Sequence, residues 1–117
     1  MNREQLKNYV MSKKATEETF PFGPDAAVYK VLGKMFALMP VGDPLSISLK
    51  CDPDFADVLR DTYDAVQPGY HMNKRHWNTV SIDGSIPDDE IEEMVDESYR
   101  LVVAKMTRKD QKKLDEL

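Results

Sequence analysis

The stretch "PGYHMNKRHWNTV" concentrates residue types that bind anions and aromatic rings. It holds both histidines of the chain, His71 and His76, its only tryptophan, Trp77, and the adjacent pair Lys74 and Arg75. No acidic residue occurs within it, although the chain as a whole carries a formal net charge of −5. Because cations contact phosphates and flat aromatic faces stack on bases, these residues indicate a binding site for nucleic acid.

Two asparagines in the same stretch add donors that suit phosphate oxygens or base edges. The candidate DNA-contacting set is therefore Asn73, Lys74, Arg75, His76 and Asn78. Two cations predict a salt slope of only about −2, well below that of a strong binder with about 6–10 phosphate contacts. We therefore expect double-stranded DNA to bind weakly to a monomer.

Two other interpretations of the stretch stay open. In the first, His71, His76 and Trp77 line a pocket for a small ligand or a protein partner, and Lys74 or Arg75 holds an anionic group. In the second, Trp77 anchors a strand in the core, and the two cations form only a solvated bend.

Metal binding and catalysis find little support in the sequence. His71 and His76 are five residues apart, which places them on opposite faces of a strand, and no HEXXH spacing occurs. Cys51 precedes a predicted helix, but Asp52 disfavours its thiolate, so a buried structural cysteine is expected. No glycine-rich phosphate loop or GXSXG elbow is present, and a base at His76 has no visible partner group. We predict no enzyme, no metal site and no cofactor.

The composition predicts a single globular domain over residues 1–117. Hydrophobic residues make up 41% of the chain and charged residues 32%. The N-terminal stretch "MNREQLKNYVMSKK" has no long apolar run, and a single cysteine forms no internal disulfide, which together predict a cytoplasmic protein without a membrane segment. The acidic balance means that any anion binding must come from a local patch.

The helices that must position this patch follow from apolar residues at helical spacing. They are predicted at residues 3–13, 53–66 and 87–106, with a short last helix after Thr107. For the second helix, Asp52 is a good N-cap and Pro53 suits the first turn. A stripe that includes Phe55, Val58 and Val66 is predicted to be its buried face.

The strands follow from alternation and turn residues. They are predicted as a hairpin at 27–40 that turns about Gly33 and Lys34, a strand at 45–50, and a strand from Trp77 that ends in an Asp83–Gly84 turn. At 45–50, apolar and polar residues alternate, which predicts one face on a core and the other in water. The pattern as a whole indicates one compact α+β domain.

The sequence also resembles a known family. The combination "HMNKRHWNTV…DGSIPD", with "GKMFAL" upstream and "SYRLVVAKM" downstream, is similar to the YjbR/MmcQ family of small bacterial proteins. The resemblance implies an antiparallel sheet flanked by helices, in a double-wing or CyaY-like arrangement, and DNA binding as the function.

The family signature falls on His71, Asn73, Lys74, His76, Trp77, Asp83 and Gly84. The resemblance attaches no catalytic role to these residues, and we assign His71, Trp77, Asp83 and Gly84 to the structural part of the signature. The leading prediction is a non-enzymatic DNA-binding or regulatory protein that contacts phosphates through residues 70–78.

Overall fold

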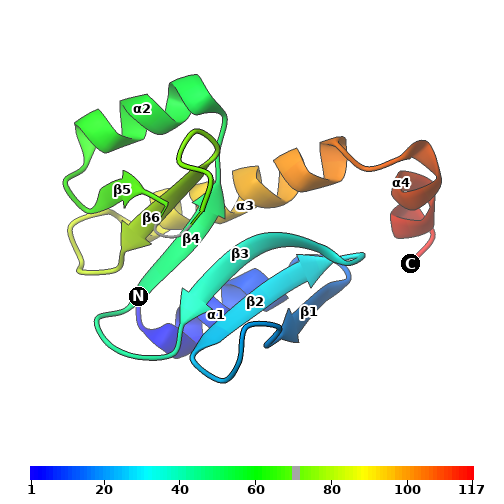
Figure 1. Ribbon diagram of the computed structural model, residues 1–117, viewed down its shortest axis with the longest axis horizontal. Coiled ribbons are helices and arrows are strands. Elements are labelled where there is room, and N and C mark those ends of the chain that lie inside the picture. Colours follow the sequence, from blue (N-terminus) through cyan, green and yellow to red (C-terminus); the bar gives the residue numbers. More distant parts are fainter. Residues whose placement is uncertain (70–71) are drawn as a thin grey trace.

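The sheet and helices are seen in a computed structural model that describes residues 1–69 and 72–117. The helices of this part of the chain are α1 (Arg3–Met11), α2 (Pro53–Thr62), α3 (Asp88–Ala104) and α4 (Arg108–Asp115) (Figure 1). The strands are β1 (Thr16–Thr19), β2 (Ala26–Val31), β3 (Lys34–Pro40), β4 (Ser46–Lys50), β5 (Val66–Pro68) and β6 (Trp77–Ser81). They form one antiparallel sheet in the order β1-β2-β3-β4-β6-β5, so the predicted α+β class is confirmed.

Local capping chemistry fixes where several helices begin. Asn2 and Gln5 form a reciprocal capping box at α1. Asp52 accepts from two backbone N–H groups at the start of α2, and Pro53 occupies the first position of that helix. Thr107 accepts from one backbone N–H group at the start of α4. The helix starts predicted from Asp52, Pro53 and Thr107 are confirmed.

The hairpin between β2 and β3 turns one residue earlier than predicted. Leu32 and Gly33 form the turn with φ values of 47° and 80°, while Lys34 already pairs with Val31. Two successive residues with positive φ give a tight turn whose twist matches that of antiparallel strands. Glycine adopts the second of these conformations without a steric penalty.

The sequence pattern missed two short strands and extended one helix too far. The missed strands, β1 and β5, lie at the two edges of the sheet. The helix α2 ends at Thr62, and Val66 belongs to β5. Phe55 and Val58 were predicted to be buried but are 49% and 53% exposed. The short helix lies by the edge strand, where it buries Ala56, and Leu59 and Tyr63 of the predicted stripe are partly buried against the core.

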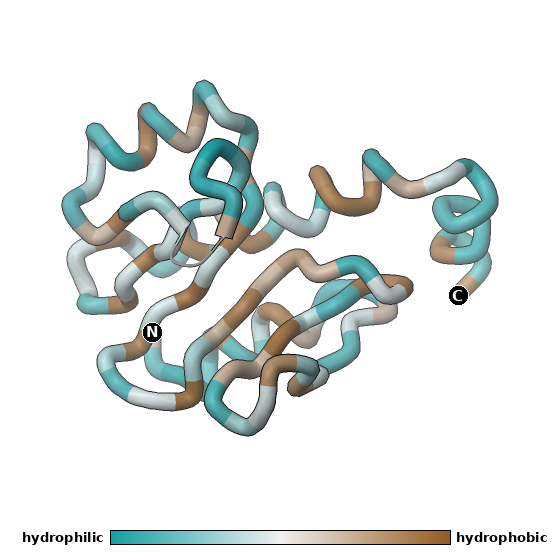
Figure 2. Tube along the Cα trace, viewed as in Figure 1, coloured by the Kyte–Doolittle hydropathy of each residue, from teal (hydrophilic) through white to brown (hydrophobic). Residues whose placement is uncertain are grey.

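The main core lies on one face of the sheet. Helices α1 and α3 lie behind the sheet in the view of Figure 1. The core cluster joins strand residues such as Tyr29, Ile47 and Val80 to helix residues such as Leu6 and Val95. Figure 2 shows hydrophobic residues along β2 and β3, and mainly hydrophilic residues in α4.

The opposite face of the sheet has no helix against it in the described part of the chain (Figure 1). Strand alternation assigns to it the side chains of Val28, Met35, Leu38, Ser48, Lys50, Trp77 and Thr79. We call this surface the open face. None of these seven residues belongs to the core cluster or to the partly buried residues packed against it.

The alternation predicted at 45–50 is confirmed, but its polar face is not simply in water. Ile47 and Leu49 join the core, and Ser48 alternates to the open face. Ser48 is nevertheless buried, and its hydroxyl forms a hydrogen bond of 2.9 Å with the Thr79 hydroxyl on the neighbouring strand. The open face is therefore partly shielded by its own side chains.

A serine of α3 bridges a gap in the sheet. Strands β3 and β4 pair over two positions only and then diverge. Ser98 is fully buried there: its hydroxyl donates to the carbonyl oxygen of Phe36 at 2.5 Å and accepts from the N–H of Lys50 at 2.8 Å. One side chain thus satisfies a backbone group on each strand.

Among the described residues, no helix has the length and hydrophobicity needed to cross a membrane.

Candidate nucleic-acid interface

The predicted anion-binding stretch forms a turn that leads into β6. The backbone oxygen of Asn73 accepts from the N–H groups of His76 at 3.2 Å and Trp77 at 3.0 Å. The side-chain oxygen of Asn73 accepts from the N–H of Arg75 at 3.0 Å. This side-chain oxygen therefore stabilises the turn itself, which is hydrophilic along its length (Figure 2).

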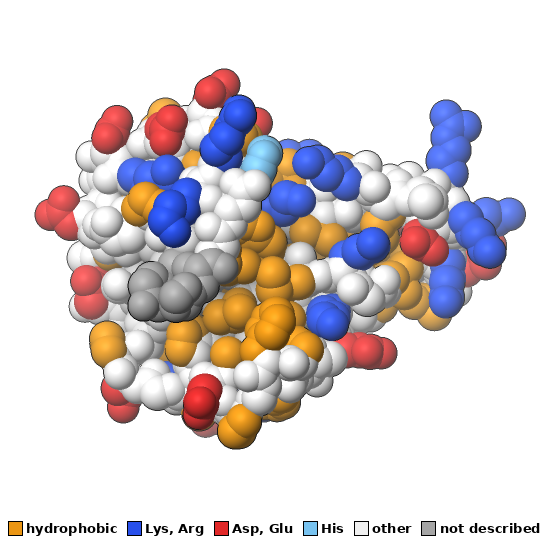
Figure 3. All heavy atoms as spheres, in the orientation of Figure 1, with side chains coloured by type: hydrophobic (Ala, Val, Ile, Leu, Met, Phe, Trp, Pro, Cys, Tyr) orange, Lys and Arg blue, Asp and Glu red, His pale blue; other side chains and the backbone are white. Residues whose placement is uncertain are grey.

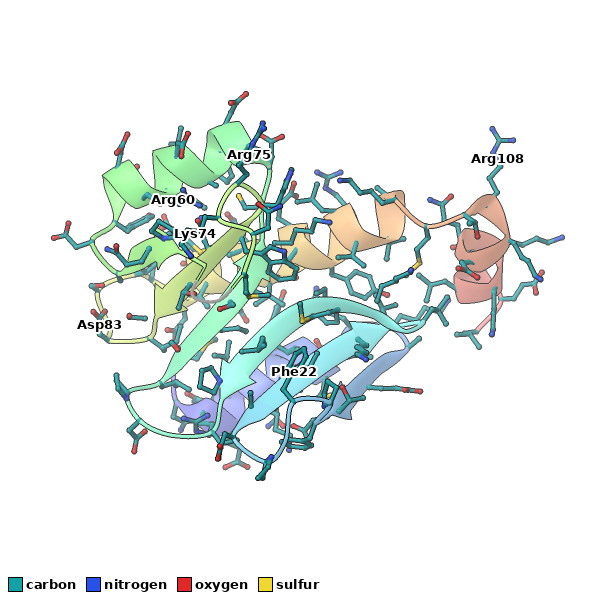
Figure 4. All side chains as sticks on the ribbon, viewed as in Figure 1. Phe22, Arg60, Lys74, Arg75, Asp83 and Arg108 are labelled. Atoms are coloured by element: carbon teal, nitrogen blue, oxygen red, sulfur yellow. The ribbon has the colours of Figure 1, made fainter. Side chains whose placement is uncertain are left out.

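Arg60 of α2 holds this turn in place. Its Nε donates to Oδ1 of Asn78 at 2.7 Å, and its Nη1 pairs with Asp57 at 3.5 Å. Its Nη2 donates to the carbonyl oxygens of Lys74 and Trp77, the second at 3.3 Å. Figure 4 shows Arg60 beside Lys74. One guanidinium group therefore ties α2 to both ends of the segment from Lys74 to Asn78.

Sequence reasoning missed Arg60. The sequence did contain one indication of its role: between Asp52 and Asp64, Arg60 is the one cation among five aspartates. A guanidinium has five donors in a fixed fork, so it can hold several acceptors at once. Its specific partners depend on how α2 lies against β6.

Asn78 must be removed from the predicted DNA-contacting set. It is 2% exposed, and its cross-strand partner is the core residue Leu49. Because successive side chains of a strand point to opposite faces, Trp77 lies on the open face and Asn78 lies on the helix side. Asn78 therefore cannot contact the same ligand surface as Lys74 and Arg75.

Lys74 and Arg75 are exposed on the turn, and Arg75 extends from its tip (Figure 4). The Lys74 ammonium donates to the carbonyl oxygen of Gly69 at 3.2 Å, which keeps it close to β5. His76 is half-buried, and its backbone oxygen accepts from the N–H of Cys51 at 2.7 Å. The turn is thereby joined to the end of β4.

The open face beside this turn is apolar at its centre. Trp77, Leu38 and Met35 are half-buried on it. Phe22, which is 71% exposed, lies in front of β2 and β3 (Figure 4). Figure 3 shows hydrophobic side chains gathered at the centre of this view, with Lys and Arg side chains above and to the right and most acidic side chains at the periphery.

Three lysines meet where β3 and β4 diverge. A shallow cavity of about 240 Å³ is lined by Lys34, Met35, Lys50, Val102, Lys105 and Met106. Burial and, secondly, the charge of Lys105 lower the pKa of Lys50. No carboxylate is found among the described residues that line this cavity. Like charges held together without a counter-ion favour an anion between them. We call Lys34, Lys50 and Lys105 the lysine cluster.

The remaining signature residues are remote from Lys74 and Arg75 or outside the described residues. Asp83 lies beyond the opposite end of β6 (Figure 4), where its carboxylate accepts from the hydroxyl of Ser85 at 2.5 Å and from its N–H at 2.9 Å. These bonds lower the pKa of Asp83. Gly84 adopts a φ of 87°, so the predicted turn is confirmed. His71 lies outside the described residues.

Cys51 is buried at the end of β4. Burial is the main cause that raises the pKa of its thiol to about 11, and the charges of Asp52 and Glu97 add to it. The thiol is therefore protonated at neutral pH, which suits a structural cysteine. In the described ranges, no three His, Cys, Asp or Glu side chains are placed to hold a metal ion.

Gly69 allows the backbone before the turn to approach β6 closely. Its N–H donates to the carbonyl oxygen of Trp77 at 2.8 Å, and a Cβ at Gly69 would lie 2.8 Å from Cβ of Trp77. We expect Gly69→Ala to lower the free energy of unfolding by about 1–3 kcal/mol, because the two backbones must separate. Gly42→Ala is the control, since nothing lies within 4 Å of its added Cβ and its φ is not positive. Urea denaturation compares them, and equal stability of the two variants would contradict the expectation.

Known sequences similar to this chain extend over its full length. A family model described as YjbR matches residues 11–101. The uncharacterized protein YjbR of Escherichia coli strain K12 is 36% identical over 118 residues, which cover 100% of both chains. The uncharacterized protein YbdF of Escherichia coli O157:H7 is 34% identical, with 95% of this chain and 92% of that protein covered.

Solved structures show the same fold. The crystal structure of the Deinococcus radiodurans protein DR2400, described as a DUF419 domain, is 39% identical with a TM-score of 0.89. The match covers 96% of this chain and 86% of that one. A crystal structure of a Pseudomonas syringae protein is 32% identical with a TM-score of 0.75, and covers 87% of this chain and 99% of that one.

Proposed function

The chain belongs to the YjbR family, and from the geometry of its open face we propose that it is a non-enzymatic protein that binds single-stranded DNA. One observation carries the proposal: Trp77 lies half-buried between two groups of cations, on a sheet face that has no helix against it in the described part of the chain. Lys74 and Arg75 precede it in the turn, and Lys50 of the lysine cluster is its partner across the strands. Aromatic side chains on a sheet stack on bases, while neighbouring cations contact phosphates.

The apolar centre of the open face favours unpaired bases over a duplex. A duplex presents phosphates and sugars to a flat surface, and these gain little from Leu38, Met35 or an indole ring. Unpaired bases expose flat faces that stack on such residues, at about 1–3 kcal/mol per base. Because Trp77 lies at this apolar centre, we propose single-stranded DNA as the ligand in place of the predicted duplex.

The net charge of −5 is offset locally, because in the view of Figure 3 Lys and Arg side chains lie near the apolar centre and most acidic side chains lie at the periphery. The Debye length is about 8 Å at physiological salt, so an anion near the open face responds mainly to the local cations. Lys74 and Arg75, together with the three lysines of the cluster at the gap between β3 and β4, would give a salt slope of about −3 to −4 on a single strand. This value predicts modest affinity that falls visibly with salt.

The alternative of a pocket at His71, His76 and Trp77 has less support from the described residues, which do not include His71. A cavity of about 510 Å³ lies between α2, α3 and the sheet, and neither His76 nor Trp77 lines it. A catalytic role for Cys51 gains no support, since its thiol is buried and protonated. Binding to the open face remains the proposal.

Fluorescence anisotropy with a labelled oligothymidylate and a matched duplex tests the proposal at low and high salt. We expect salt-sensitive binding that favours the single strand, together with quenching of Trp77, the only tryptophan of the chain. Lys74→Ala/Arg75→Ala should raise the Kd roughly fivefold or more at low salt.

The matched control is Arg108→Ala/Lys109→Ala, which removes the same two residue types from the remote helix α4 (Figure 4). We expect its Kd to stay within about twofold of the unmodified chain. Absence of salt-sensitive binding, or equal losses in the two double variants, would refute the proposal.

A further inference from the structure

A second candidate site lies on the helix side of the sheet. Its cavity has a volume of about 510 Å³, which is in the range of small-molecule sites. The strands contribute Leu49, Asn78 and Val80. Phe55 and Leu59 come from α2, and Tyr63 follows its last residue. Glu90, Glu93, Met94 and Glu97 come from α3. Lys50, Cys51 and Asp52 complete the lining between β4 and α2.

Asn78 lines this cavity and carries an unpaired donor. Its Oδ1 accepts from Nε of Arg60 at 2.7 Å, which identifies the other terminal atom as the amide nitrogen. That Nδ2 is buried and has no hydrogen-bond partner among the described residues. A buried donor without an acceptor is costly, and an acceptor atom on a ligand would relieve this cost.

Carboxylates dominate the charged lining, which contains Asp52, Glu90, Glu93 and Glu97. Lys50 is the one cation among the described lining residues, but it alternates with Leu49 and directs its side chain toward the open face. Arg100 pairs with Glu97, and Arg60 reaches Asn78 from beside the cavity, so the negative charge that favours a cationic ligand comes mainly from Asp52, Glu90 and Glu93.

An exposed aromatic ring offers a place for the apolar part of such a ligand. Phe55 is 49% exposed, and it lines the cavity together with Leu59 and Met94. The Tyr63 hydroxyl donates to the Glu90 carboxylate, which joins the end of α2 to the start of α3. This hydrogen bond therefore links the two helices beside the cavity.

We propose that this cleft binds a small organic cation that has an apolar body and a hydrogen-bond acceptor. The cationic group lies among the carboxylates, the body packs against Phe55, Leu59 and Met94, and the acceptor receives the Nδ2 proton of Asn78. This site does not depend on the proposed DNA binding, because Asn78 and Trp77 point to opposite faces of the sheet.

Tyramine is a suitable probe, since it combines an ammonium group, a ring and a phenolic acceptor. We would titrate it into the ¹⁵N-labelled full chain and follow the amide spectrum by NMR. We expect saturable shifts of the Asn78 side-chain NH₂ and of the backbone amides of Phe55 and Met94, with a Kd in the millimolar range. Phenethylamine, which lacks the acceptor, should bind about threefold or more weakly, and para-hydroxyphenylacetate should not saturate.

Two double variants test the contribution of the carboxylates. Asp52→Asn/Glu93→Gln should weaken tyramine about fivefold while it keeps the fold, since asparagine also caps helices well. The control Asp61→Asn/Glu92→Gln removes the same charges from α2 and α3 at residues that do not line the cavity, and should change the Kd by less than about twofold. The proposal is overturned if neither amine shifts the Asn78 side chain saturably, if the acid binds equally well, or if both double variants weaken binding equally.

Discussion

Replacement of Arg60 by alanine should lower the free energy of unfolding by about 2–4 kcal/mol. The Arg60 side chain donates to Asn78 Oδ1 and to two carbonyl oxygens, that of Lys74 in the turn and that of Trp77 at the start of β6. Removal of the guanidinium leaves the buried Asn78 without a partner for either end of its amide. The buried acceptor then costs its desolvation free energy, which exceeds the net value of an ordinary hydrogen bond.

Urea denaturation followed by Trp77 fluorescence measures this loss. Arg60→Lys should recover only part of it, because one ammonium cannot reproduce the geometry of the guanidinium fork. Arg100→Ala is the matched control: Arg100 pairs with Glu97 on the surface of α3, its side chain is 63% exposed, and such pairs contribute about 0–1 kcal/mol. If Arg60→Ala is no more destabilising than Arg100→Ala, Arg60 does not hold the turn.

Ser98→Ala should lower the free energy of unfolding by about 2–3 kcal/mol. The substitution removes one hydroxyl but leaves two backbone groups unpaired, the carbonyl of Phe36 and the N–H of Lys50. Each buried group without a partner costs about 1–3 kcal/mol. The better helix propensity of alanine offsets only about 0.5 kcal/mol of this cost.

Hydrogen exchange identifies the cause as well as the size of this effect. The Lys50 amide should lose more protection than the amides of β2, because Ser98 is the group that accepts from it. Ser85→Ala, at an exposed turn, serves as the control and should change stability by less than about 1 kcal/mol. Unchanged protection of Lys50 in Ser98→Ala would contradict the assigned bridge.

The sequence by itself determined the features that depend on neighbouring residues. The caps at Asp52 and Thr107, the turn at Gly84 and the alternation at 45–50 all agree with the structure. Each of these features is satisfied within a few residues of the chain, so its pattern can be recognised locally. The concentration of Lys74, Arg75 and Trp77 in one acid-free stretch is local in the same sense.

The missed elements depend on their partners. Strand β1 is "TEET", without hydrophobic alternation, and β5 is three residues that end in a proline. Such edge strands exist because a neighbouring strand supplies the hydrogen bonds, and the sequence of an edge strand contains little of that information. The buried side of α2 could not be predicted from the sequence either, because an apolar residue of a helix is buried only where the sheet packs against it. Phe55 belongs to the apolar stripe but lies at the edge of the cavity and is exposed.

Only the tertiary structure decided the two candidate sites. Strand alternation separates Asn78 from Trp77, but which face receives the helices depends on how the whole chain packs. Trp77 and Lys50 therefore lie on the open face. The lysine cluster at the gap between β3 and β4 joins residues from β3, β4 and the end of α3 that are distant in sequence. On the helix side, Asn78 lies at one cavity with the carboxylates at the start of α2 and along α3. Strand pairing and helix packing bring these groups together although they are distant in sequence.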